Sequence, residues 1–558
     1  MSFFDQASLV MIPSGYKTSK VYSIKPTDGS GDLAFTRSND TATRVGPDGL
    51  IEKVRTNLLT YSNTFSNAAW IKTDSSVTSG QSGYDGTNNA WLLANTASSG
   101  NLTQAISFSG FNTLSFYAKA GTHQNLFILF NGSGFNATAS YNLSTGVISN
   151  ASADALITTA TSVGNGWWRL TITGSRSNVD VRFYPSNNNT GGATTNGNIL
   201  IQNIQLEAGD IATPYIATTS AAVSVGPVAN VPRLDYLNSS CPRLLLEPQR
   251  TNVMLYSEQL NNAAWDNPNQ VTITANAGVS PDGYANADRL LSTGSSWFLA
   301  QQKELTNGTS YVLSVYVKSN TSGNQTFRLV ANGNITSSNF TATTSWQRFT
   351  LSFTGDTGLL SHGIVRDTNN SSADLLVWGA QIEAGAYATS YIPTLGAAVT
   401  RGADAALKTS ISSLIGQDEG TIFVEFEYNY SDSTTQVLFK ANQTTDANSV
   451  GIEVQGTTIK GLVNSGGGNI ATITGTIATG TIKAALAYKT NDMAFYVNGT
   501  QVGVDTSGSI AFAGVVDILT IGQFLLNGGT FFPASRPFNQ ALVFKTRLSN
   551  SDLAALTA

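Results

Sequence analysis

The chain has 558 residues and a low charge content. Charged residues make up 12%, and 30 Lys and Arg against 35 Asp and Glu leave a net charge of −5. This length allows three or four domains, and the lack of a basic cluster argues against nucleic acid as a partner, because phosphate binding needs concentrated Lys and Arg. The single cysteine, Cys241, excludes an intrachain disulfide, so burial of apolar residues must hold the fold together.

The first ten residues, MSFFDQASLV, lack the basic region and apolar run of a secretory signal. No stretch of the sequence approaches the ~18 apolar residues of a membrane helix. Ser, Thr, Asn and Gly must supply most of the polar surface, as is typical of β-rich extracellular or particle-borne proteins. We therefore expect a protein that is made in the cytoplasm and carried on a particle, without insertion into a membrane.

A long segment of the chain occurs twice. Arg55–Trp70 and Arg250–Trp265 are identical at nine of sixteen positions. Further phrases recur in the same order: GYDGTNNA and PDGYANAD, LSFYAKA and LSVYVKS, WWRLTIT and WQRFTLS, IQLEAG and AQIEAG. This pattern indicates a tandem duplication of a unit of roughly 150–160 residues, not a short-period solenoid.

Alternating apolar and polar residues predict β-strands in both copies. In LSFYAKA, Leu114, Phe116 and Ala118 fall on one face of the predicted strand, and polar residues fall on the other. Clusters of Gly, Asn and Ser separate such runs about every ten residues, as in antiparallel sandwiches. Trp70 and its counterpart Trp265 are predicted to anchor the two cores.

A related phrase follows each copy, PYIATTSAAVSVG from Pro214 and SYIPTLGAAVTRG from Ser390, and both are predicted to be extended connectors. In the last part of the chain, Asn498-Gly499 within FYVNGTQV predicts a tight hairpin turn between two strands. Close to the C-terminus, the capping box that starts at Ser549 predicts a helix.

The repeated units resemble jelly-roll carbohydrate-binding modules of the galactose-binding-like group. The resemblance is carried by the opening NLLTYSNTFSNAAW or NVMLYSEQLNNAAW, the central LSVYVKS, the W-x-R strand and the closing IQNIQLEAG or GAQIEAG. Such modules often hold a calcium ion with acidic residues. Here Asn203 and Ala380 stand in the closing strands where an acid is usual, so no metal and no other cofactor is predicted.

The last part of the chain resembles concanavalin A-like lectin/glucanase domains of the laminin-G type, on the phrases GTIFVEFEYNY, AYKTNDMAFYVNGTQVG and ALVFKTRLSNSDLAALT. The arrangement as a whole is similar to virion surface proteins of tailed bacteriophages, of the head fibre or tail fibre type. In such proteins the N-terminal segment docks on the particle and the distal domains face the host.

The predicted fold class is all-β, with two jelly rolls and one concanavalin A-like sandwich as tandem antiparallel β-sandwiches behind an extended N-terminal anchor. The predicted domains are a docking segment (1–54), a first module (55–218), a connector (219–249), a second module (250–394), a short connector (395–402) and the concanavalin A-like domain (403–558).

The candidate ligand-binding residues are Trp167 and Arg169 in the first copy and Trp346 and Arg348 in the second. In each pair, two residues on one strand face put a guanidinium beside an indole, where it can stack on the ring. This arrangement stabilises the strand locally, or it presents an aromatic platform for a sugar, and both interpretations stay open here.

Catalytic candidates are few. His123 and His362 are the only histidines, and each is expected to be a surface or loop residue. Glu425 and Glu427 share one face of a predicted strand, roughly 6–7 Å apart, a separation compatible with glycoside hydrolysis. The enzymes of this superfamily carry a longer acidic pattern, so the pair is interpreted as part of a polar sheet face and the protein is predicted not to be an enzyme.

These observations predict a structural phage virion protein, a head fibre or a decoration protein, whose sandwiches bind host-surface glycans for adhesion. Its expected partners are a capsid or tail protein, contacted through the N-terminal segment, the host glycans, and further copies of itself in a homo-oligomer, a trimer. It is expected at the virion surface. The alternatives are a virion polysaccharide depolymerase, a tail fibre or receptor-binding protein, and a purely structural spacer.

Overall fold

The computed structural model describes residues 2–108, 110–132, 136–174, 178–190, 195–266, 270–369, 371–512, 515–526, 529–531 and 536–558. Strands account for 51% of the residues and helices for 3%, which confirms the predicted all-β class of tandem antiparallel sandwiches. The chain divides into two compact units: a smaller one, Val54–Gly226, and a larger one made of Met1–Lys53 and Pro227–Ala558. Among the described helices, none is long and apolar enough to cross a membrane.

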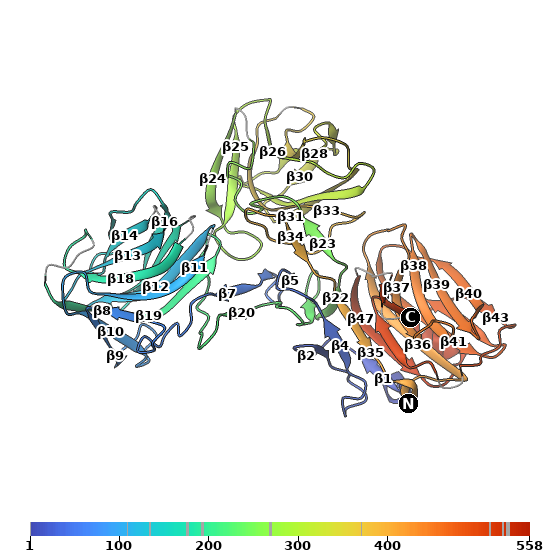
Figure 1. Ribbon diagram of the computed structural model, residues 1–558. Coiled ribbons are helices and arrows are strands. Elements are labelled where there is room, and N and C mark those ends of the chain that lie inside the picture. Colours follow the sequence, from blue (N-terminus) through green and yellow to red (C-terminus); the bar gives the residue numbers. More distant parts are fainter. Residues whose placement is uncertain are drawn as a thin grey trace. The chain divides into compact units, whose positions relative to one another are not determined.

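The smaller unit is the first module, a sandwich of two six-stranded antiparallel sheets (Figure 1). The first sheet has the order β16 (Ala155–Gly164), β17 (Trp167–Gly174), β12 (Asn112–Ala120), β19 (Gly197–Ala208), β10 (Ala90–Asn95) and β9 (Ser75–Gln81). The second has the order β15 (Ile148–Ser149), β14 (Ala137–Asn142), β13 (Asn125–Gly132), β18 (Asn178–Ser186), β11 (Asn101–Phe108) and β8 (Ile71–Thr73). Two short strands, β7 (Arg55–Asn57) and β20 (Val223–Val225), pair beside them.

The first module has its core between these sheets. Leu114, Phe116 and Ala118 of β12 are fully buried there, while Tyr117 on the opposite face is partly exposed, as the alternation predicts. Trp70 is also fully buried, and its indole N–H donates to the Tyr61 carbonyl oxygen at 2.9 Å. Burial of such side chains contributes about 1.5–3 kcal/mol each, so the apolar stripe of each strand sets which face turns inward.

The second module belongs to the larger unit and repeats this design with five strands in each sheet. One sheet has the order β24 (Val271–Gly278), β25 (Ala287–Ser292), β33 (Asp374–Ala384), β27 (Ser310–Ser319) and β31 (Gln347–Thr354). The other contains β26 (Phe298–Lys303), β32 (Leu360–Val365), β28 (Gln325–Ala331), β29 (Ile335–Thr336) and β30 (Phe340–Ala342). Short strands β23 (Arg250–Asn252) and β34 (Val399–Arg401) pair as β7 and β20 do. The predicted anchor Trp265 is 5% exposed and takes the place of Trp70.

The C-terminal sandwich is formed by two large sheets. The eight-stranded sheet has the order β21 (Arg233–Asp235), β22 (Arg243–Leu246), β47 (Arg536–Phe544), β36 (Glu419–Tyr428), β41 (Gly480–Lys489), β42 (Met493–Val497) and β43 (Thr500–Asp505), and β1 (Leu9–Met11) also pairs with β47. The nine-stranded sheet has the order β2 (Tyr16–Lys17), β3 (Lys20–Val21), β4 (Leu33–Thr36), β35 (Ala405–Lys408), β44 (Ile518–Ile521), β37 (Gln436–Asn442), β38 (Ser449–Gln455), β39 (Thr458–Ser465) and β40 (Gly468–Thr476). A further pair, β45 (Phe524–Leu526) and β46 (Gly529–Phe531), is separate.

Two local predictions for this sandwich are confirmed. Asn498 and Gly499 both have positive φ and join β42 to β43, which pair from Val497 and Thr500 outward. The side chain of Ser549 accepts a hydrogen bond from the Asp552 backbone N–H at the start of helix α2 (Asn550–Thr557). The other helices among the described residues are α1 (Phe3–Gln6) and a 3-10 turn (Ser412–Leu414).

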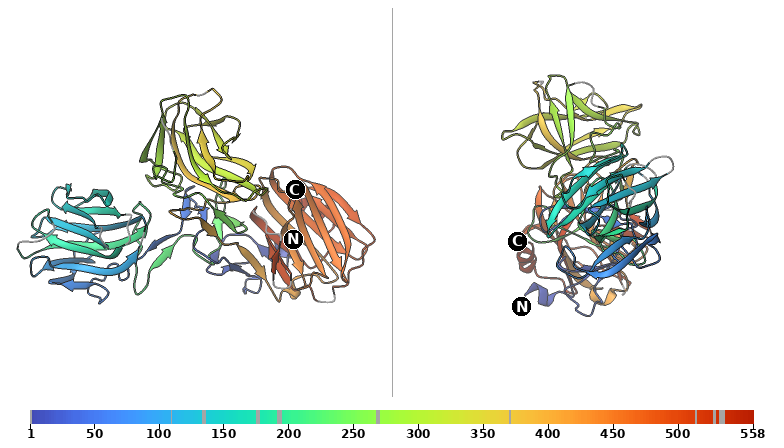
Figure 2. Two further views of the ribbon diagram at one scale, coloured as in Figure 1. Left: turned by 45° about the horizontal axis from the view of Figure 1, so that its top comes forward. Right: turned by 90° about the vertical axis from the view of Figure 1, so that its left-hand side faces the viewer.

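Residues predicted as an N-terminal segment and as a connector contribute strands to the C-terminal sandwich. Leu9 of β1 lies opposite Val543, and Leu244 of β22 lies opposite Phe538, both on β47. Leu9 and Leu244 are buried in the same core as the residues of β36 and β41. Blue N-terminal strands accordingly lie beside the orange and red strands of this sandwich in Figure 2. Docking of this segment on a particle stays a prediction.

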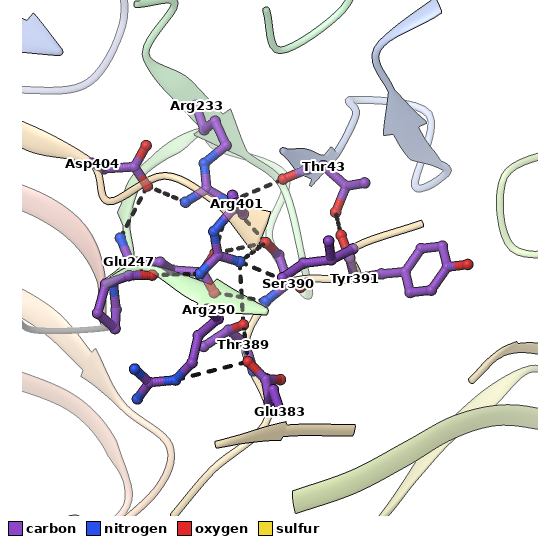
Figure 3. Close-up of polar contacts among 12 residues, drawn as sticks. Thr43, Arg233, Glu247, Arg250, Glu383, Thr389, Ser390, Tyr391, Arg401 and Asp404 are labelled. Atoms are coloured by element: carbon purple, nitrogen blue, oxygen red, sulfur yellow. Dashed lines mark hydrogen bonds and ion pairs between the residues drawn. The ribbon is translucent and has the colours of Figure 1, made fainter. Parts of the chain in front are cut away.

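A buried cluster of charged side chains lies in the larger unit, between the second module and the C-terminal sandwich (Figure 3). Arg37 donates to Asp404 at 2.9 Å, and Arg233 also pairs with Asp404. Glu247 accepts from Arg233 at 2.7 Å and from Arg401 at 2.8 Å. All five side chains are at most 4% exposed. Burial by itself would raise the pKa of Glu247, but Arg401 and Arg233 outweigh it and lower that pKa to about 2.

The same cluster holds the connector that ends the second module. The backbone N–H and the hydroxyl of Ser390 donate to Glu247 at 2.7 and 2.6 Å. Arg233 also donates to the carbonyl oxygen of Thr43 at 3.0 Å, and the Thr43 hydroxyl donates to the Tyr391 carbonyl oxygen at 2.6 Å. Thr43 belongs to the hairpin of β5 (Thr43–Val45) and β6 (Ile51–Lys53), so this hairpin is joined to the second module.

Candidate functional site

The first predicted pair, Trp167 and Arg169, lies on β17. Trp167 is 1% exposed, and Arg169 donates to the carbonyl oxygen of Thr213 at 2.5 Å. Cross-strand register places Arg169 opposite Tyr117 of β12. These contacts favour the packing interpretation of the pair, because a side chain as buried as Trp167 presents little surface to a ligand.

The second predicted pair, Trp346 and Arg348, does not stack as expected. The guanidinium of Arg348 lies 5.3 Å from the ring centre of Tyr316, and the cation above the Trp346 ring, also at 5.3 Å, is Lys318. The reason is register: β27 and β31 pair so that Tyr316 is directly opposite Arg348, while Trp346 lies just outside that ladder. The expected partner of Trp346 was therefore wrong, and a ligand-binding role for either residue stays a prediction.

A stacked pair of tyrosines marks a different place on the same sheet of the first module. Tyr84, from the loop between β9 and β10, lies over Tyr117 with ring centres 3.6 Å apart and planes 5° apart. The Asn203 amide donates to the Tyr84 hydroxyl at 3.3 Å. Burial, together with hydrogen bonding to Tyr84, raises the pKa of Tyr117 to about 12. Tyr117 is therefore a neutral phenol near pH 7.

Polar side chains surround this tyrosine pair. The fully buried Gln202 donates to the carboxylate of Asp85 at 3.2 Å and also to the side-chain oxygen of Asn89. Its own amide oxygen accepts from the Tyr84 backbone N–H at 3.1 Å. Asn63 donates to the backbone carbonyl of Asn89 at 3.0 Å. Asp85 and Asn89 are exposed, so one carboxylate and one amide are held at the surface in fixed positions.

We call Tyr84, Tyr117, Asp85, Asn89 and Asn63 the sheet-face site of the first module. It combines a flat aromatic surface with a carboxylate and amides. An aromatic plane packs on the C–H face of a ring, and amide or carboxylate groups bond its hydroxyls. The arrangement is therefore suited to a small polyhydroxylated ring, bound without covalent chemistry.

The second module has a counterpart of this site, with different chemistry. Tyr316 lies opposite Trp378, as Tyr117 lies opposite Gln202. In the place that corresponds to the sheet-face site, Lys53 forms ion pairs with Glu258 and Asp282.

The carboxylates proposed for hydrolysis are engaged in other contacts. Glu425 accepts from the Asn539 amide at 2.9 Å and from the Gln540 amide at 2.6 Å. Glu427 accepts from the Thr481 hydroxyl at 2.7 Å and pairs with Arg243 at 3.2 Å. These contacts are those of a polar sheet face.

Each histidine was expected to be a surface or loop residue: His123 does lie in a loop, between β12 and β13, but the expectation was wrong for His362, which lies in β32. His123 is 3% exposed and hydrogen-bonds the Asn95 side chain at 3.0 Å, and His362 is fully buried with its ring 5.4 Å from that of Phe353. Both rings fill space in the modules, and burial lowers the pKa of each, to about 4 for His362. Within the described part of the chain, no group of three or more His, Cys, Asp or Glu side chains could hold a metal ion.

Comparison with known proteins assigns no family. No protein-family model matches the chain, and no curated protein matches it. Among solved structures, the chain is similar to the Ruminococcus gnavus IT-sialidase CBM40, with 15% identity over 27% of this chain and 91% of that one and a TM-score of 0.24. A NanB sialidase from Streptococcus pneumoniae matches with 15% identity over 26% of this chain and 25% of that one, at a TM-score of 0.24. A heptameric SAP-like pentraxin from Limulus polyphemus matches with 17% identity over 25% of this chain and 70% of that one, at a TM-score of 0.21. Likeness at these TM-scores assigns no function to the chain.

Sequence reasoning missed the sheet-face site, although the signal was present. The loop phrase GYDGTNNA, with Tyr84, Asp85 and Asn89, was found as a repeated element and not as a candidate site. The stacking of Tyr84 on Tyr117 brings together residues of a loop and a strand that are distant in the sequence. Only the folded sheet shows that they meet.

Proposed function

We propose that the protein is a non-catalytic glycan-binding protein, with the sheet-face site of the first module as its receptor for a sugar ring. The observation that carries this proposal is the Tyr84–Tyr117 stack, rimmed by Asp85, Asn89 and Asn63. The composition adds support. Only 12% of the residues are charged, so the polar surface consists largely of hydroxyls and amides, which can exchange hydrogen bonds to water for hydrogen bonds to a sugar.

The charge of the site selects among sugars. Asp85 is the carboxylate of the site, and its partner side chains, Gln202 and Thr87, are neutral. A carboxylate that already accepts such bonds also accepts from sugar hydroxyls, but it repels an acidic sugar. The nearby Arg169 is engaged with the backbone of Thr213. The proposal therefore names neutral hexoses as the ligand class.

Affinity at one such site is expected to be weak, because a single stacked ring and a few exposed hydrogen bonds replace bonds to water. Display in several copies turns weak contacts into useful avidity. We accordingly propose a homo-oligomer, a trimer, at the surface of a tailed-phage virion, as a head fibre or decoration protein. Light scattering of the purified protein tests the oligomer, and electron microscopy of labelled particles tests the location.

The test of the binding site is a glycan array followed by titration with the full-length protein and three variants. Tyr84→Ala removes the stacking plane, and Asp85→Asn removes the carboxylate. Tyr184→Ala is the matched control, since Tyr184 is a partly buried tyrosine on the other sheet of the module, packed on Phe127.

Loss of the stacking plane is expected to lower glycan affinity about two- to tenfold, from the ~0.5–1.5 kcal/mol of an aromatic contact. Asp85→Asn is expected to weaken the binding of neutral sugars and to reduce the preference for neutral over acidic sugars. Equal binding by Tyr84→Ala and Tyr184→Ala, or an array without any hit, would contradict the proposal.

A further inference from the structure

The segment Leu50–Lys53 lies on the second module as a bound peptide would. The Ile51 backbone N–H donates to the Pro281 carbonyl oxygen at 2.9 Å. The Ile51 side chain is 8% exposed and packs in one apolar cluster with Trp378 and Tyr391. Leu50 fits against Gly283, where an added Cβ would come within 2.7 Å of it. A backbone hydrogen bond and apolar contacts thus hold the segment on the second module independently of the charged group of Lys53.

The ammonium group of Lys53 is the best-defined part of this contact. It donates to both carboxylate oxygens of Glu258, at 2.9 and 2.7 Å, and lies 2.6 Å from Asp282. It also lies 5.4 Å from the ring centre of Trp378. Two carboxylates and the face of an indole are strong partners for a cation.

The acceptors are held in place by other groups of the second module. The Asn286 amide donates to Glu258 and to Asp282, each at 3.2 Å. Asp282 also accepts from the Tyr284 backbone N–H at 3.1 Å and from the Ser280 hydroxyl. The Asp282 side chain is 1% exposed and that of Glu258 17%. Fixed, largely buried acceptors cannot turn to water if the ammonium leaves, so they favour a replacement cation.

Electrostatics agree with this geometry. Burial would lower the pKa of Lys53, but Glu258 and Asp282 outweigh burial and raise it above its usual value. Lys53 is therefore an ammonium throughout the neutral range. Two carboxylates, those of Glu258 and Asp282, face the single positive charge of Lys53. Their formal charges therefore exceed that of the ammonium by one, and removal of the ammonium leaves both negative charges without a cation.

The first module lacks this chemistry at the corresponding positions. Where the second module has Glu258 and Trp378, the first has Asn63 and Gln202. The Gln202 amide donates to Asp85, the counterpart of Asp282, and so fills part of the role that the ammonium has in the second module. The face of the first module thus carries one carboxylate, that of Asp85, and the face of the second carries two, those of Glu258 and Asp282.

We propose that the second module carries a site for a primary ammonium group, built from Glu258, Asp282 and Trp378, and that Lys53 of the same chain fills it as an anchor. Lys53 directly precedes the first module in the sequence. The anchor fastens the chain to the second module just before it enters the first, and it keeps the sheet face of the second module from binding glycan. Only this last consequence rests on the proposed function.

Chemical rescue in the full-length protein tests the site. Lys53→Ala removes the atoms of n-propylammonium, so that this ion can be supplied in solution. We expect the variant to unfold its larger unit at a lower temperature and to exchange amide hydrogens faster over residues 45–53. Millimolar n-propylammonium chloride is expected to restore at least half of both losses, by mass action on the folded state. Tetramethylammonium and sodium chloride at equal ionic strength are expected to restore neither.

Lys318→Ala is the matched control. Lys318 belongs to β27 of the second module and, like Lys53, lies close to an indole, that of Trp346 at 5.3 Å. No ion pair between Lys318 and a carboxylate is found among the described residues. This variant should gain nothing from n-propylammonium. If Lys53→Ala does not fold by itself, the variant is refolded with and without n-propylammonium, and the folded fraction that is recovered serves as the readout.

Three results would overturn the ammonium site: no response of Lys53→Ala to n-propylammonium, the same response in Lys318→Ala, or a larger response to calcium than to the amine. Titration of the wild type with a glycan found on the array is expected to give one site per chain. Two sites per chain would refute the masking of the second module and leave the anchor intact. An array without hits would refute the proposed function, while the rescue experiment would still decide the ammonium site.

Discussion

Replacing Asp404 by Asn tests whether the buried charge cluster holds the larger unit together. Asp404 accepts from Arg37 at 2.9 Å and pairs with Arg233, and the Glu247 backbone N–H donates to it at 3.0 Å. The side chains of Asp404, Arg37 and Arg233 are 0% exposed. Asparagine keeps the size and one acceptor oxygen but removes the charge, so the guanidiniums of Arg37 and Arg233 would lose a fully buried carboxylate partner.

The expected magnitude follows from this burial. Removing one partner of a buried ion pair costs about 3–5 kcal/mol, because the remaining charge stays buried without compensation. Asp404 has two such partners, while the retained amide oxygen returns part of the loss. We therefore expect Asp404→Asn to lower the free energy of unfolding of the larger unit by about 3–5 kcal/mol, a large share of the 5–15 kcal/mol of a typical domain.

Hydrogen exchange followed by mass spectrometry across a urea series measures this change, because peptides from Val54–Gly226 and from the larger unit are read separately. The matched control is Glu419→Gln, which breaks the exposed pair with Lys489, whose side chains are 34% and 53% exposed. That change should cost less than about 1 kcal/mol. Peptides of the smaller unit should be unaffected by either variant. A loss in Asp404→Asn no larger than in Glu419→Gln would refute the reasoning and show that the cluster is close to neutral in net stability.

Three further outcomes are expected. The pKa of His362 is ~6.5 in the unfolded chain and about 4 in the folded protein, where burial lowers it. The free energy of unfolding is therefore unaffected by this group above pH ~6.5 and falls as the pH drops from there towards 4, because the unfolded chain binds the proton first. Urea unfolding of wild type against His362→Asn should show the wild type losing about 2 kcal/mol more between pH 7 and pH 5, and parallel curves would contradict this. Gly499→Ala, at φ +78° in the hairpin turn, should cost about 1–2 kcal/mol, whereas Gly323→Ala, with no positive φ and open space at its Cβ, should cost little; equal costs would show that the turn does not need its glycine. Incubation with host capsule should release no new reducing ends, and reducing ends that disappear in Glu425→Gln would show that the protein is a hydrolase.

The sequence by itself determined the local structure and the repeat. Period-two alternation placed Leu114 and Phe116 towards the core, Asn498-Gly499 marked a hairpin, and Ser549 marked the start of a helix, and the structure bears out each. These features depend on neighbouring residues and on one face of a strand, and such information is contained in a short stretch of chain.

Only the tertiary structure decided which strands share a sheet and which charges meet. Leu9 pairs with Val543, and Lys53 meets Glu258, 205 residues away. Alternation shows that a strand has an apolar face but not which partner covers it. An isolated lysine in the sequence does not reveal whether its ammonium points into water or between two carboxylates. Both depend on how distant segments close on one another, and for this reason the sheet-face site and its lysine-filled counterpart appear only in the folded chain.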